Sequence, residues 1–194
     1  MQYFIFIILL LEWNLIFSQK VAVVLSGGGA KGLAHPGVLK ALQENDIPID
    51  FIAGTSMGAL VGAFYAAGYS TEEIVELATS AELQNWIENK PKKEYLHFQE
   101  KDVPDPSWVT LKLSIDSSFS ASFGTTISND YMLNFALAKK FTSSTELSGS
   151  DFDNLFVPFR ATASEIFTEK AVVLKSGNLF EAARASMAVP FFYR

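Results

Sequence analysis

Residues 51–67 read FIAGTSMGALVGAFYAA and contain the pattern that decides the fold. The apolar run at 51–53 predicts a short buried strand, and the apolar residues that recur at helical spacing after Ser56 predict a helix that Gly68 ends. Between the two lies Gly54-Thr55-Ser56-Met57-Gly58, a G-x-S-x-G sequence. In the context of strand, sharp turn and helix, this sequence presents a serine hydroxyl above the edge of a sheet.

Ser56 is therefore the candidate nucleophile. Gly54 and Gly58 are its supporting residues, because a β-carbon at either position would collide with the neighbouring strand or helix backbone. The pentapeptide alone also occurs by chance, and such a motif is a hypothesis until its context supports it. Here the strand-like run before it and the helical repeat after it supply that context.

A second glycine-rich segment follows the first predicted strand. Residues 21–26 (VAVVLS) form a continuous apolar run, typical of a central parallel strand buried on both faces, and lead into residues 27–32 (GGGAKG). The next residues predict a helix with Pro36 in its first turn, and a second strand at 47–53 completes a β-α-β unit. The predicted inner face of this helix consists of Ala34, Val38, Ala41 and Leu42.

The glycine segment has a second interpretation, because Gly27, Gly29 and Gly32 match the G-x-G-x-x-G loop of dinucleotide-binding proteins. Such a site needs an acidic residue at the carboxyl end of the second strand, where this chain has the G-x-S-x-G segment. No Gly-Lys-Ser/Thr follows the glycines, which argues against a P-loop. A nucleotide-binding module remains an alternative that the sequence disfavours.

Both glycine segments are expected at the carboxyl ends of adjacent parallel strands, where doubly wound sheets bind their ligands. The backbone N–H groups of Gly27, Gly28 and Gly29 are therefore candidates for an oxyanion hole beside the serine. Lys31 and Gly32 are supporting residues of this segment. Lys31 would add a positive charge, although a solvated lysine at a helix start is its alternative interpretation.

Residues 26–35 (SGGGAKGLAH), followed at this spacing by the Ser56 pentapeptide, resemble the opening of the patatin-like phospholipases. Residues 157–163 (VPFRATA) and 182–190 (AARASMAVP) are similar to a later strand and helix of that family. The resemblance implies a three-layer α/β fold with a mainly parallel central sheet flanked by helices. It also implies a lipid acyl hydrolase that cleaves phospholipid esters through a Ser-Asp dyad, at a membrane surface.

In that family the dyad aspartate stands in a downstream Asp-Gly-Gly or Asp-Gly-Ala motif, which this sequence lacks. We therefore expect residues 19–194 to be a catalytic domain that is incomplete at its C-terminal side, with the dyad aspartate beyond the chain. A non-catalytic acyl-binding remnant is the third interpretation of the sequence.

Composition excludes several other classes. The chain of 194 residues has a net charge of -6, which argues against a nucleic-acid partner. It has no cysteine, and no cluster of His, Asp and Glu has metal-ligand spacing, so neither a metal nor another cofactor is expected. The two histidines, His35 and His97, are expected to be structural or surface residues, because elbow-type hydrolases place their histidine last in chain order.

The remaining segments are ordinary by comparison. Residues 1–18 are apolar until Ser18 and predict a signal peptide, with a retained anchor as the alternative. Together with the resemblance, this predicts export to a bacterial envelope or secretion. Ser70-Thr71-Glu72-Glu73 is a capping box for a helix that is predicted to reach Ile87. Further predictions are a charged loop at 88–107, a strand at 109–116, a loop at 117–128, a helix at 129–141, a polar linker, strands at 156–163 and 171–175, and a last helix.

Overall fold

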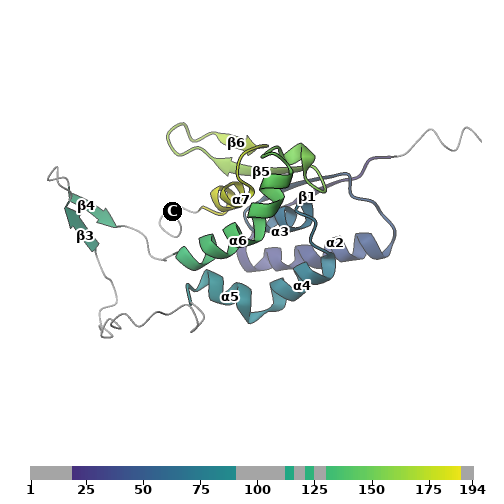
Figure 1. Cartoon of the computed structure of the whole chain (residues 1–194), viewed down its shortest axis with the longest axis horizontal. Coiled ribbons are helices and arrows are strands. Elements are labelled where there is room, and N and C mark those ends of the chain that lie inside the picture. Colours follow the sequence, from purple (N-terminus) through teal and green to yellow (C-terminus); the bar gives the residue numbers. More distant parts are fainter. Residues whose placement is uncertain (1–18, 91–111, 116–120, 125–129, 189–194) are drawn as a thin grey trace, which may run out of the picture.

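The structure is a computed structural model that describes residues 19–90, 112–115, 121–124 and 130–188 (Figure 1). Its main sheet has four strands, in the order β1-β2-β5-β6. The first three strands run parallel and the last runs antiparallel to its neighbour, which confirms the predicted α/β fold with a mainly parallel sheet. The strands are β1 (Ala22–Leu25), β2 (Phe51–Thr55), β5 (Phe159–Ser164) and β6 (Ala171–Leu174).

Helices connect these strands and pack against the sheet (Figure 1). Helix α3 packs on β2 and β5, and α7 packs on both α3 and β5. The helices are η2 (Gly29–Ala34), α2 (His35–Glu44), α3 (Met57–Ala66), α4 (Thr71–Thr79), α5 (Ala81–Ile87), α6 (Tyr131–Leu147), η4 (Phe152–Asn154) and α7 (Leu179–Met187). A separate antiparallel pair consists of β3 (Lys112–Ile115) and β4 (Ala121–Gly124).

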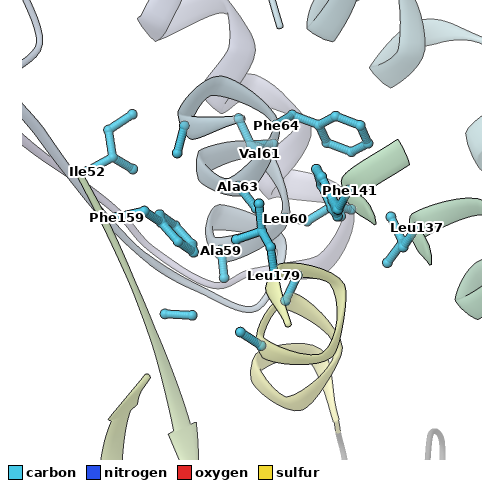
Figure 2. Packing of buried hydrophobic residues seen from close by; sticks show 14 of the residues in the cluster. Ile52, Ala59, Leu60, Val61, Ala63, Phe64, Leu137, Phe141, Phe159 and Leu179 are labelled. Carbon is cyan, nitrogen blue, oxygen red and sulfur yellow. The ribbon is translucent and has the colours of Figure 1, made fainter. Parts of the chain in front are cut away.

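Helix α3 forms the centre of the hydrophobic core, and all its residues except Tyr65 are buried (Figure 2). It packs on Ile52 and Phe159, the fully buried side chains of β2 and β5. On its other side Phe64 meets Phe141 of α6, with ring centroids 4.7 Å apart. Since burying one large apolar side chain contributes about 1.5–3 kcal/mol, these contacts fix the helix firmly on the sheet.

The sheet is buried unevenly within the described residues. Leu25 is 3% exposed, whereas Val24, which points to the other face of the same strand, is 79% exposed. The prediction that residues 21–26 are buried on both faces is therefore wrong for this part of the chain. The continuous apolar run does not reveal this, because it carries no information about which faces the rest of the chain covers.

The predicted inner face of helix α2 is wrong by part of a turn. Pro36 and Leu39 are its buried residues, whereas Val38 is 49% exposed. The helix lies beside α4, and the Thr71 hydroxyl donates to the Gln43 side chain at 3.2 Å. These contacts rotate the helix so that Leu39 faces the core.

Serine residues set the limits of α4 and α5. The predicted capping box is confirmed: the Glu73 N–H donates to the Ser70 hydroxyl at 3.2 Å, and the Ser70 N–H donates to the Glu73 carboxylate at 2.9 Å. The single helix predicted from here to Ile87 is wrong, because Ser80 adopts an extended conformation, with φ -82° and ψ 153°, and separates α4 from α5. The Ser80 hydroxyl then caps α5 by accepting from Leu83 N–H.

The later predictions are confirmed in part. Helix α6 continues six residues past Phe141, over the sequence predicted as a linker, because Phe141 and Thr145 stay buried on its inner face. Strand β4 lies inside the predicted loop 117–128 and pairs with β3, which occupies part of the strand predicted at 109–116. Residues 1–18 and most of the charged loop lie outside the described residues.

Candidate active site

Ser56 occupies the sharp turn between β2 and α3. It is half-buried and has φ 53° and ψ -121°, a conformation that side-chain-bearing residues seldom adopt. Such backbone strain costs about 1–3 kcal/mol and persists only where the surrounding structure enforces it. The turn therefore has the strained geometry of a nucleophile elbow.

Gly54 and Gly58 allow the two strands and the helix to approach closely enough to enforce this turn. A β-carbon on Gly54 would lie 2.4 Å from the Gly58 carbonyl oxygen. A β-carbon on Gly58 would lie 2.3 Å from the carbonyl oxygen of Leu25 in β1. Neither contact is possible, so both positions require glycine.

The glycine loop lies directly beside Ser56. A β-carbon on Gly27 would be 3.3 Å from the Ser56 Cβ, so the loop and the serine are in contact across the carboxyl ends of β1 and β2. Gly28 and Gly29 both have positive φ, 153° and 55°. Gly27, Gly28 and Gly29 are all exposed, and their N–H groups donate no backbone hydrogen bond within the described chain. They remain available to a ligand.

The loop leads into the 3₁₀ helix η2 and not directly into the α-helix. The Lys31 N–H donates to Gly28 O at 3.2 Å, and the Lys31 side chain is exposed at the surface. Gly32 is buried against the residue after Ser56, because a β-carbon on Gly32 would lie 2.6 Å from the Met57 Cβ. His35 Nε2 donates to the Ser26 carbonyl at 2.8 Å and so ties α2 to the start of the loop.

Two contacts join this turn to distant parts of the chain. The Ser56 N–H donates to the Ser186 hydroxyl of α7 at 2.7 Å. Thr55 and Thr162, at the ends of β2 and β5, share a hydrogen bond of 2.5 Å between their hydroxyls. Neither Ser186 nor this threonine pair is predicted from the sequence as a site residue. Ser186 lies in the segment quoted for the family resemblance, but its spacing from Ser56 carries no signal of contact.

The core beneath Ser56 is closely packed. A cavity of about 10 Å³ lies behind Met57, and its walls come from η2, α3, α4 and α5. This volume is at the lower limit for one water molecule. Among the described residues, this cavity behind Met57 is therefore too small for more than about one water molecule.

Asp50, the acidic residue directly before β2, lies away from the edge that carries Ser56. Asp50 accepts a hydrogen bond from Val21 N–H at 2.7 Å, at the amino ends of β1 and β2 and so at the opposite edge of the sheet. In the described ranges no group of three His, Cys, Asp or Glu side chains lies close enough together to hold a metal ion. His97 lies outside these ranges.

Comparison with known proteins identifies one matching family and relatives in animals and fungi. The family model described as patatin-like phospholipase matches residues 23–194. Patatin-like phospholipase domain-containing protein 6 of Mus musculus is 29% identical over 171 residues, which cover 88% of this chain and 10% of that protein. Lysophospholipase NTE1 of Kluyveromyces lactis is 59% identical over 51 residues, which cover 26% of this chain and 4% of that protein. The matched part of this chain therefore covers 10% of the mouse protein and 4% of the yeast protein.

A solved structure has a similar fold. It is the crystal structure of full-length SpcU in complex with full-length ExoU, from the type III secretion system of Pseudomonas aeruginosa. The TM-score is 0.52 at 19% sequence identity, and the match covers 89% of this chain and 39% of that chain. At this level of identity the likeness concerns the fold alone.

Proposed function

The chain belongs to the patatin-like phospholipase family, and on this premise we propose that it hydrolyses the acyl esters of phospholipids or lysophospholipids, with Ser56 as nucleophile. The observation that carries the proposal is the strained backbone of Ser56, held beside a loop whose N–H groups are unused within the described chain. The name of the yeast relative, a lysophospholipase, supports the same substrate class.

The proposed reaction has two stages. The Ser56 hydroxyl oxygen attacks the ester carbonyl carbon while its proton passes to a carboxylate, and the N–H groups of Gly27, Gly28 and Gly29 stabilise the resulting oxyanion. The ester C–O bond then breaks, and the alcohol part of the lipid leaves with a proton. Water attacks the acyl-enzyme in the same manner and releases the fatty acid. One such N–H donor typically contributes a factor of about 10²–10³ in rate.

The proton acceptor is the part of this mechanism that we assign outside the described residues. Within them, Ser56 makes its hydrogen bond through its N–H to Ser186, and no carboxylate contacts its hydroxyl. His35 is engaged with Ser26 O through Nε2, which argues against it as the base. We therefore assign proton transfer to an aspartate, as in a Ser-Asp dyad.

Access to the substrate is also part of the proposal. Phospholipids are presented at membrane surfaces, and we assign the enzyme to such a surface after export from the cytoplasm. In the described ranges, no helix combines the length and the apolar character that crossing a bilayer requires. We assign contact with the surface to side chains near the exposed edge that carries Ser56, because the ester must reach the serine hydroxyl there.

Labelling with a fluorophosphonate tests the proposal directly, because this probe reacts with activated serine nucleophiles. We expect a single labelled peptide that contains Ser56, and no label in Ser56→Ala. Ser143→Ala is the matched control, since Ser143 is an exposed serine of α6 remote from the turn in sequence. The rate of lysophospholipid hydrolysis, measured as released fatty acid, should fall at least 10³-fold in Ser56→Ala and stay unchanged in Ser143→Ala.

The alternatives give different results. A non-catalytic acyl-binding protein would bind lipid and take no label at Ser56. A nucleotide-binding module would be stabilised by NAD or ATP and would be indifferent to Ser56→Ala. Either result would contradict the proposed hydrolase.

A further inference from the structure

The hairpin that joins β5 and β6 ends in two exposed apolar side chains. Ile166 is 80% exposed and Phe167 is 95% exposed. Tight turns usually contain Gly, Pro, Asn, Asp or Ser, which favour the backbone conformations and local hydrogen bonds of a turn. An isoleucine and a phenylalanine side by side at such a tip are unfavourable in solution unless a second, apolar environment covers them.

The backbone of this tip is held in place by hydrogen bonds. The Glu165 carboxylate accepts from Phe167 N–H at 3.0 Å and from Thr168 N–H at 2.6 Å. The Glu165 N–H donates to Lys170 O at 2.9 Å and closes the hairpin. Ile166 and Phe167 therefore lie in a turn whose backbone is already ordered, so binding of the tip costs little backbone conformational entropy.

The tip projects from the same edge of the sheet as Ser56. Strand β5 runs parallel to β2, and Thr162 pairs with Thr55, the residue before Ser56. The chain continues past Thr162 in the direction in which β2 ends, and Ser164 makes the last pair with β6. At about 3.3 Å per residue, the tip stands about 10 Å beyond the level of Thr55.

The distance by which the tip extends beyond Thr55 is comparable to the depth at which apolar side chains enter a membrane interface. Apolar side chains of peripheral proteins enter the boundary between headgroups and acyl chains to a depth of about 5–10 Å. An aromatic ring and a branched aliphatic chain are suited to this layer. The exposed charged residues of the turn, Glu169 and Lys170, can stay in the headgroup region, and Glu165 is half-buried. A lipid surface at the tip would bring its esters to the edge that carries Ser56.

We propose that Ile166 and Phe167 form an interfacial anchor that inserts into the lipid surface and places that surface against the edge with Ser56. This inference rests on the proposed lipid hydrolase function for its purpose, but the insertion itself can be measured without any hydrolysis. The occupant is a lipid surface and not a second protein.

Phe156 supplies a matched control. It is 78% exposed, and it precedes β5, whose first residue Phe159 pairs with Ile52 near the start of β2. Phe156 therefore lies at the opposite edge of the sheet from the hairpin tip. The same substitution at the two positions distinguishes insertion of the tip from non-specific binding of the protein to lipid vesicles.

The test uses the full chain with phosphatidylcholine vesicles whose acyl chains carry bromine, which quenches nearby indoles. Phe167→Trp and Phe156→Trp are compared with the unmodified chain, whose own tryptophan signal is subtracted. We expect the added fluorescence of Phe167→Trp to shift to the blue and to be quenched at least twofold, and that of Phe156→Trp to be unchanged. Absence of quenching in Phe167→Trp, or equal quenching in both variants, would overturn the inference.

A second measurement separates the anchor from the active site. In the double variant Ile166→Ser/Phe167→Ser, hydrolysis of vesicle lipid should fall about tenfold, while hydrolysis of a short-chain soluble ester stays unchanged. An equal loss on both substrates would contradict an anchoring role. Both hydrolysis assays use a form of the protein that contains the aspartate assigned above. If this form hydrolyses neither substrate, the proposed function fails, whereas the bromine quenching still decides whether the tip inserts.

Discussion

Ser56 adopts its strained conformation because groups from several elements fix it on different sides. Gly58 allows its turn to approach β1, Gly27 lies so close that a side chain there would press on the Ser56 β-carbon, and the Ser186 hydroxyl accepts a hydrogen bond from the Ser56 N–H. The last of these contacts joins residues that are 130 positions apart in the sequence. A hydrogen bond to the backbone of a strained residue restrains its φ and ψ, so we infer that Ser186 helps to hold the turn that presents the Ser56 hydroxyl.

Replacing Ser186 by alanine tests this role. The Ser56 N–H would lose its acceptor, and we expect a loss of about 1 kcal/mol in the free energy of unfolding. Because the turn would then populate other conformations, kcat should fall about tenfold while KM stays within twofold. Ester hydrolysis and urea unfolding measure the two effects, with Ser143→Ala as control. A variant with unchanged kcat would show that the glycines alone hold the turn.

At the scale of the element, the elbow depends on the close approach of β1, β2 and α3. In Gly58→Ala the new methyl group would lie 2.3 Å from Leu25 O, in a contact with backbone that no side-chain rotation relieves. We expect a loss of about 3 kcal/mol or more in unfolding free energy, together with loss of fluorophosphonate labelling. Urea denaturation measures the first quantity and gel fluorescence the second.

Gly37 of α2 provides the comparison for this prediction. A β-carbon there would meet no atom within 4 Å, and its φ lies outside the positive range. Gly37→Ala should therefore stabilise the protein by about 0.5–1 kcal/mol through helix propensity alone. Equal effects of the two substitutions would mean that Gly58 has no steric role.

The β5–β6 turn is an element with a predicted pH dependence. The Thr168 side chain, followed by the N–H groups of Phe167 and Thr168, lowers the pKa of the Glu165 carboxyl below its ordinary 4.5. A carboxyl with a lowered folded pKa stabilises the turn above its unfolded pKa, and this contribution is lost as pH falls through the folded pKa. Amide exchange at Phe167 and Thr168 should therefore be less protected in Glu165→Gln than in the unmodified chain at pH 7.

The difference between the two proteins should shrink as the pH is lowered from 4.5 through the folded pKa, because the unmodified carboxyl is then neutral as well. Glu169→Gln is the control, since the Glu169 side chain makes no hydrogen bond within the described chain and belongs to the same turn. The difference in amide protection between Glu165→Gln and the unmodified chain could also persist at low pH. That result would contradict a role for the carboxylate charge and would attribute the lost protection to the changed geometry of the side chain.

Local sequence patterns predicted the elements best where the pattern is itself the cause of the structure. The Ser70 capping box and the strand-turn-helix order at Ser56 are of this kind, because their contacts lie within a few residues. The inner face of α2 and the end of α4 at Ser80 could not be predicted in this way. The face of α2 depends on its packing against α4. The break at Ser80 comes from a local helix cap, and the apolar repeat that continues through it predicts an unbroken helix.

At the scale of the whole molecule, the site combines two kinds of information. Ser56 and Gly27 come from the first β-α-β unit, and the sequence placed them at one edge because parallel strands end together. Ser186 and Thr162 come from the last third of the chain, and they reach this edge only after β5 and α7 have packed on β2 and α3. The sequence carries no short-range signal for such contacts.

The position of α7 is fixed in turn by a buried charge pair with the start of α6. Arg184 Nη2 lies 2.6 Å from Asp130 Oδ2, and the two side chains are 7% and 20% exposed. Arg184 Nε also donates to the Asn134 side chain. Since α7 carries Ser186, this pair links the N-terminal end of α6 to the helix that contacts the Ser56 turn.

Breaking the pair should destabilise the whole fold, because the buried Arg184 guanidinium would lose its hydrogen-bonded ion pair with Asp130. We expect Asp130→Ala to lower the free energy of unfolding by about 3 kcal/mol, at the lower end of the range for buried pairs because Asp130 is 20% exposed. The Arg160–Asp153 pair, 2.8 Å apart with Asp153 54% exposed, is the surface counterpart, and Asp153→Ala should cost at most about 1 kcal/mol. Urea denaturation of both variants at the same ionic strength measures the contrast. Similar losses in the two variants would contradict the prediction that the buried Arg184–Asp130 pair stabilises the fold more than the surface Arg160–Asp153 pair.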